Sequence, residues 1–104
     1  MIMQVCAVYD KKVGAYLLPQ FFRTKGEAVR AFQDAVASES APFAKHAEDY
    51  LFCRLGAYDD NAGSFETVQP APEILLTAMD CLVADLNAPP AVVSQAVKSQ
   101  LNGK

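Results

Sequence analysis

The chain has 104 residues, of which 52% are hydrophobic and 20% are charged, and its formal net charge is −3. The length allows one domain, and the composition is that of a folded globular protein, which excludes a disordered tail and a membrane span. The acidic balance excludes a globally basic nucleic-acid binder, although a basic face can still exist locally.

Two short strands are predicted at the start of the chain. Residues Ile2–Tyr9 are rich in β-branched and apolar side chains, and the polar turn Asp10–Lys12 follows them. Val13–Leu18 is a second apolar run, so the order predicts a β-hairpin. Gln20–Arg23 is expected to remain extended, because Pro19 cannot sit in the centre of a sheet.

A helix is predicted to begin after Thr24. Thr24 and Glu27 form the T-x-x-E pattern of a capping box, in which the hydroxyl accepts from a free N–H of the first turn and the carboxylate accepts from the Thr24 N–H. The segment KGEAVRAFQDAVAS follows. Its apolar residues recur at helical spacing and predict one buried face: Ala28, Val29, Phe32, Ala35 and Val36.

A second hairpin is predicted from Tyr50–Tyr58 and Ser64–Val68, which are joined by the turn Asp59–Gly63. Simple alternation divides the first of these strands into two faces. One face would carry Leu51, Cys53, Leu55 and Ala57. The other would carry Tyr50, Phe52, Arg54, Gly56 and Tyr58.

Two helices are predicted to follow. Pro72 and Glu73 suit the first turn of a helix that continues to about residue 86, and Val92–Leu101 has the pattern of a last amphipathic helix. The order β-β-α-β-β-α-α predicts an α+β fold, with an antiparallel sheet of about four strands in two hairpins and helices packed on one face. We expect residues 1–86 to form the domain and residues 87–104 to form a helical extension.

The three cysteines do not form a recognisable site. Their number is odd, their spacing is wide and no C-x-x-C motif occurs, so the close pairs of a structural zinc site are missing. No targeting segment is apparent, and we expect reduced cysteines in the core of a cytosolic protein: Cys6, Cys53 and Cys81.

His46 is the single histidine and lies in the stretch KHAED. Paired with Glu48 or Asp49 it would suit a small enzyme, but an active site needs several supporting groups. The sequence shows no nucleophile motif and no glycine loop of the kind that cradles phosphates. We therefore expect a protein that is not an enzyme and needs no metal and no cofactor.

The basic residues concentrate in one early segment. Residues 11–30 contain five of the nine lysines and arginines and one acid, Glu27, interleaved with aromatic residues. Cations that follow a phosphate backbone and rings on which bases stack are how proteins bind single strands. The alternative is that the rings belong to the core and the lysines are ordinary turn residues. The candidate DNA-binding residues are Lys11, Lys12, Tyr16, Phe22, Arg23, Lys25 and Arg30.

Two runs of sequence carry a family resemblance: VYDKKVGAYLLPQFFRTKGEAVRAF and KHAEDYLFCRLGAYDDNAGSFE. They resemble the small nonstructural protein of gokushoviruses, single-stranded DNA phages of the microvirus family, over roughly residues 5–80. The most specific pieces are Pro19 with Phe21 and Phe22, the helix around Arg30, and Glu48–Tyr50. The family usually has Pro before the Glu-Asp pair, where this chain has Ala47.

The resemblance implies a protein of the host bacterial cytoplasm that is not part of the virion. Such a protein would bind single-stranded DNA and help to switch genome replication from duplex copying to single-strand synthesis. We expect a homodimer, because a second copy would double a small basic patch. The alternative is a regulator that does not bind DNA and contacts a phage or host replication protein, which the acidic residues of 55–104 favour.

Overall fold

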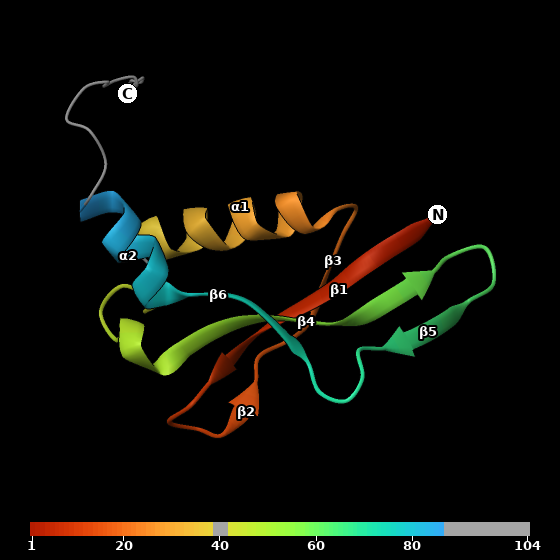
Figure 1. The fold of residues 1–104 in the computed structure, drawn as a ribbon, viewed down its shortest axis with the longest axis horizontal. Helices are drawn as coiled ribbons and strands as arrows, with labels where there is room; N and C mark the ends of the chain where they lie inside the picture. The colour runs from red at the N-terminus through yellow and green to blue at the C-terminus, as the bar shows by residue number, and fades with distance from the viewer. Residues whose placement is uncertain (39–41, 87–104) are drawn as a thin grey trace, which may run out of the picture.

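The computed structural model describes residues 1–38 and 42–86 and shows a mixed α+β fold (Figure 1). Six strands form one antiparallel sheet, two more than expected. The strands are β1 (Ile2–Asp10), β2 (Ala15–Tyr16), β3 (Gln20–Phe22), β4 (Tyr50–Asp59), β5 (Ser64–Thr67) and β6 (Glu73–Thr77). The helices are α1 (Lys25–Ala37), α2 (Ala78–Leu86) and a short 3-10 helix (Ala47–Asp49).

The two longest strands, β1 and β4, form the centre of the sheet (Figure 1). They pair from Ile2 opposite Asp59 to Asp10 opposite Tyr50. Strands β2 and β3 pair with successive parts of the outer edge of β1, and β5 and β6 do the same on β4. Both predicted hairpins are confirmed, although β2 is much shorter than the apolar run Val13–Leu18 suggested.

One cluster of buried side chains joins both helices to the sheet. The ring of Phe32 in α1 stacks on Phe52 in β4, with centroids 4.8 Å apart and planes 4° from parallel. The predicted apolar face of α1 is confirmed at its three buried residues, which include Phe32. The cluster consists of Cys6, Ala28, Phe32, Val36, Ala47, Phe52, Ala78 and Cys81.

Thr24 caps α1 as the sequence predicts. Its Oγ1 accepts a hydrogen bond from the Glu27 N–H at 3.0 Å. The Glu27 carboxylate differs from the expected capping box, because it accepts from the N–H of Arg23 at 2.8 Å and not from that of Thr24. The helix start is therefore fixed to the end of β3 as well as to its own first turn.

The prediction of a single helix from Pro72 was wrong. Residues Glu73–Thr77 form β6, which pairs with β4, and α2 begins only at Ala78. Thr77 and Asp80 form a reciprocal cap, with Thr77 Oγ1 accepting from the Asp80 N–H at 2.9 Å and the Asp80 carboxylate accepting from the Thr77 N–H at 3.0 Å. This T-x-x-D pattern is the local signal for the true helix start.

The predicted faces of β4 are also wrong on one side of a β-bulge in that strand. Val5 pairs with Gly56 and Cys6 pairs with Arg54, so Leu55 has no partner in β1. The extra residue shifts the alternation by one position. Tyr58 therefore lies on the face opposite to that of Phe52, whereas simple alternation places the two rings together.

Residues of the predicted C-terminal extension, 87–104, lie outside the described part of the chain. The helix expected at Val92–Leu101 falls within that range. Within residues 1–38 and 42–86, no helix has both the length and the apolar character needed to cross a membrane.

Gly56 is required because the backbone of β5 lies directly against it in the sheet. A Cβ atom at this position would overlap the carbonyl oxygen of Glu66 and lie 3.1 Å from the Cα of Thr67. Because backbone atoms of β5 must move to make room, we expect Gly56→Ala to lower the free energy of unfolding by about 1–3 kcal/mol. Urea denaturation followed by circular dichroism measures this change.

Gly26→Ala is the matched control. A Cβ atom at Gly26 meets only the Thr24 hydroxyl oxygen, at 3.9 Å, and Gly26 lies in the first turn of α1. Alanine there is expected to stabilise the protein by about 0.5–1 kcal/mol, because glycine loses more backbone freedom in a helix. Equal effects of the two substitutions would contradict the close approach at Gly56.

The expectation of reduced core cysteines is confirmed: all three are buried, and none forms a disulfide. Burial raises the pKa of the Cys6 thiol to about 11 and also raises the pKa of Cys53. At about pH 8, roughly one Cys6 side chain in a thousand is then a thiolate, the form that attacks disulfide reagents.

We therefore expect the native protein to react slowly with Ellman's reagent, and the protein in concentrated urea to release three equivalents of thionitrobenzoate at once. Absorbance at the thionitrobenzoate band measures both. Rapid reaction of the native protein at all three thiols would contradict the observed burial.

Candidate nucleic-acid interface

One face of the sheet carries a row of aromatic side chains. On β1, Cys6 and Val8 face the cluster that contains α1, so alternation places Val5 and Tyr9 on the opposite face. Direct cross-strand partners share a face, and this face extends over five strands through four pairs: Tyr9–Tyr16, Val5–Phe21, Met3–Tyr58 and Tyr58–Phe65. We call this surface the aromatic face, and its rings are Tyr9, Tyr16, Phe21, Tyr58 and Phe65.

The β1–β2 hairpin lies at one end of the aromatic face. The rings of Tyr9 and Tyr16 are 4.8 Å apart, and Tyr16 is 42% exposed. Partial burial raises the pKa of Tyr16, so its phenol is neutral at physiological pH. Lys11 and Lys12 lie in the adjoining turn, and both are exposed.

Backbone contacts hold this turn in place. The Asp10 carboxylate accepts from the N–H of Lys12 at 2.9 Å, and Gly14 adopts the positive φ of 75° that the turn requires. The N–H of Lys11 donates to the carbonyl of Asp49 at 2.8 Å. The turn is thus fixed by its backbone, and the described residues include no ion pair of either lysine side chain.

Of the other predicted basic residues, two form ion pairs and one is exposed to solvent. Arg23 pairs with Glu27 at 3.0 Å, and Lys25 pairs with Glu73 at 3.2 Å. Arg30 is exposed on α1 and is distant in sequence from the β1–β2 hairpin. Of the seven residues predicted from sequence, the structure places Lys11, Lys12 and Tyr16 together in the hairpin. Arg23 and Arg30 line a separate hollow at the start of α1, where Glu27 lies between them.

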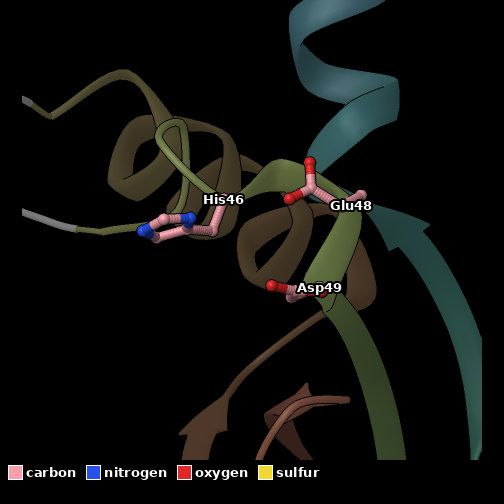
Figure 2. A group of neighbouring side chains, drawn as sticks. All are labelled: His46, Glu48 and Asp49. Atoms are coloured by element: carbon pink, nitrogen blue, oxygen red, sulfur yellow. The ribbon is translucent and has the colours of Figure 1, made fainter.

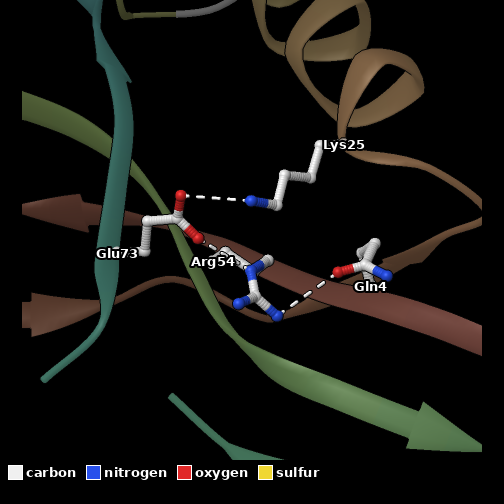
Figure 3. Close-up of polar contacts among 4 residues, drawn as sticks. All are labelled: Gln4, Lys25, Arg54 and Glu73. Carbon is white, nitrogen blue, oxygen red and sulfur yellow. Dashed lines mark hydrogen bonds and ion pairs between the residues drawn. The ribbon is translucent and has the colours of Figure 1, made fainter. Parts of the chain in front are cut away.

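Figure 3 shows the network that occupies Lys25. The Glu73 carboxylate accepts from both Lys25 and Arg54, and Arg54 also donates to Gln4 at 3.3 Å. The hydrogen bonds from Arg54 and Lys25 lower the pKa of Glu73. This network connects α1 to β6, β4 and β1. Lys25, which the sequence suggested as a phosphate contact, therefore has a structural role.

Phe22 is placed in the core. It is half-buried against the central cluster, and its ring meets Phe52 edge-on with centroids 6.4 Å apart. Its neighbour Phe21 lies on the aromatic face and is 44% exposed. Sequence reasoning chose Phe22 and missed Phe21, although strand alternation already requires the two rings to point to opposite sides.

Three further rings of the aromatic face were missed. Tyr9 could have been found from the hairpin, because a turn centred on Lys12 and Val13 pairs it with Tyr16. Tyr58 and Phe65 lie in the second hairpin. The β-bulge at Leu55 shifts the alternation of β4, so simple alternation assigns Tyr58 to the wrong face. A turn signal alone therefore predicts both pairs of rings, but not the face of the sheet on which the second pair lies.

His46, Glu48 and Asp49 also come together, around the 3-10 helix before β4 (Figure 2). Their potential ligand atoms lie within 4.8 Å of one another. His46 and Glu48 are exposed, so water can satisfy their polar atoms without an ion. The absence of a metal requirement stays a prediction.

Most of the chain matches a known protein family. Residues 3–81 match the family model described as phage ORF5 protein. The chain belongs to the phage ORF5 protein family. No curated protein and no solved structure matches it significantly. The matched range contains the described sheet except for Ile2, so the aromatic face and the hairpin of this phage ORF5 protein lie within the range that matches the family model.

The Glu73 network predicts a specific response to pH. The carboxyl pKa of Glu73 is lower in the folded protein than its ordinary value of about 4.3. Its contribution to stability is therefore present above that value and is lost as the pH falls through the lowered pKa of the folded state. We expect Glu73→Gln to lower the urea midpoint at about pH 7 and to narrow the difference between neutral and acidic midpoints.

Glu66→Gln is the control for this measurement. Glu66 is exposed on β5, and no ion pair within residues 1–38 and 42–86 involves it. Its urea midpoints are expected to follow those of the unaltered protein at each pH. An equal loss of pH dependence in both variants would contradict a special role for Glu73.

Proposed function

We propose that this phage ORF5 protein is an accessory protein that binds single-stranded DNA at the β1–β2 hairpin. The observation that supports this proposal is the juxtaposition of Lys11 and Lys12, both exposed and held by a fixed backbone, with the exposed ring of Tyr16. Lysines supply phosphate contacts, and the ring supplies a stacking surface. The pairing of these two features favours a nucleic acid over a simple anion.

The charge distribution limits how strongly one copy can bind. Two phosphate contacts give a slope of about −1.4 when the logarithm of the binding constant is plotted against that of the salt concentration. The net charge of −3 opposes binding at long range. We therefore propose a homodimer, in which two hairpins on one strand raise the overall avidity.

The proposed biological role rests on the resemblance to gokushovirus proteins. A phage protein that covers single strands favours single-strand synthesis over duplex copying, and this is the role that the resemblance to gokushovirus proteins implies. We propose that the protein acts in the host bacterial cytoplasm during genome replication and does not enter the virion. Binding, and not catalysis, is the proposed activity.

Charge reversal at the hairpin tests the proposal. We expect Lys11→Glu combined with Lys12→Glu to abolish binding of a labelled oligothymidine in fluorescence anisotropy at low salt, because both phosphate contacts become repulsive. Lys12→Glu alone is expected to weaken binding and to bring the salt slope about 0.7 closer to zero.

Lys45→Glu is the matched control for the single substitution. Lys45 is also exposed, lies outside the hairpin, and changes the net charge by the same amount. Equal effects of Lys12→Glu and Lys45→Glu would show that only total charge matters and would refute the hairpin site. If the unaltered protein binds neither single-stranded nor duplex oligonucleotide at low salt, the alternative of a regulator that contacts a replication protein is favoured.

A further inference from the structure

A second group of rings lies on the aromatic face, away from the hairpin. Tyr58 contacts Phe65 with centroids 4.7 Å apart, and Phe21 lies 5.6 Å from Tyr58 and 6.3 Å from Phe65. Phe65 is 63% exposed and Phe21 is 44% exposed. Three rings from β3, β4 and β5 thus form one exposed cluster, which we call the distal cluster.

The distal cluster and the hairpin lie on the same face of the sheet. Tyr58 pairs with Met3 near the start of β1, and Tyr16 pairs with Tyr9 near its end. Tyr9 lies six positions after Met3 in an extended strand, which corresponds to about 20 Å. Val5 and Ala7 lie between them on this face and are buried, so a ligand that spans the two groups of rings passes over these residues without direct contact.

The charges around the distal cluster do not block an anionic ligand. Asp59 and Glu66 lie one residue from Tyr58 and Phe65, so alternation places their carboxylates on the opposite face. The Asp60 carboxylate accepts from the amino group of Met1 at 2.6 Å. The face is therefore neutral at this end and positive at the hairpin, where Lys11 and Lys12 lie.

We infer that the distal cluster is a second base-stacking station, so that one single strand of DNA lies along β1 from the hairpin to Phe65. This inference rests on the proposed function and adds the residues Phe21, Tyr58 and Phe65 to its site. The complementarity of charge fixes the phosphate contacts at the hairpin, while neutral rings accept bases of any sequence.

The test compares strands of two lengths. An oligothymidine of about two nucleotides is too short to reach both stations, whereas one of about twelve can reach both. Phe65→Ala is expected to weaken binding of the longer strand by about fivefold or more and to leave binding of the shorter strand unchanged, because the hairpin retains its contacts. Fluorescence anisotropy at low salt measures both affinities.

Val83→Ala is the matched control. Val83 is an exposed apolar residue on α2, at 45% exposure, and takes no part in the aromatic face. We expect it to leave both affinities unchanged. Circular dichroism of both variants verifies that the fold is retained, and Phe21→Ala provides a second probe of the same cluster.

The outcomes separate the two proposals. If Phe65→Ala and Phe21→Ala leave the longer strand bound as before, while charge reversal at the hairpin abolishes binding, the second station is refuted and the proposed function stands. If the unaltered protein binds neither strand, both fail. If the two variants change only the sedimentation coefficient of the protein, the distal cluster is a contact between copies and the inference is overturned.

Discussion

The pairing of β1 with β4 contains the irregularity on which the aromatic face depends. Leu55 is the extra residue of a bulge, and Phe52 and Tyr58 lie on either side of it. These two residues are six positions apart, so a regular strand would place both rings on one face. The bulge allows Phe52 to stack on α1 while Tyr58 joins Phe65. Gly56 beside the bulge then lets the backbone of β5 approach closely enough to complete the cluster.

Ion pairing decides which of the early basic residues remain available to a ligand. Glu27 and Glu73 engage Arg23 and Lys25, and these contacts hold α1 against the sheet. The hairpin lysines have no such partner among the described residues. The Asp10 carboxylate lies in the same turn, but it accepts backbone N–H groups there, so the two lysine side chains still give an acidic chain a local cationic end. With only two such lysines, the proposed binding would depend on salt to a modest degree, with a slope of about −1.4.

The sequence predicts what is local and misses what depends on tertiary pairing. Thr24 and the apolar spacing after it locate α1, and the turn residues locate both hairpins. The run at Ile74 fits a strand or a helix equally well, and only pairing with β4 decides between them. For the candidate site, the hairpin residues are found because they are neighbours in the chain. Phe65 is not found, because its place on the face depends on the bulge in another strand.

The chemistry of the aromatic face favours binding without sequence selection. Reading a base requires amide, carboxylate or guanidinium groups aimed at its edges, and the β1 residues between the two groups of rings are Val5 and Ala7. Rings can stack on every base, while lysines contact a phosphate that is the same at each nucleotide. A protein that must cover a whole single-stranded genome needs this tolerance. The placement of both lysines at one end also means that each copy contributes little charge, so the proposed binding would depend on several copies acting together along the strand.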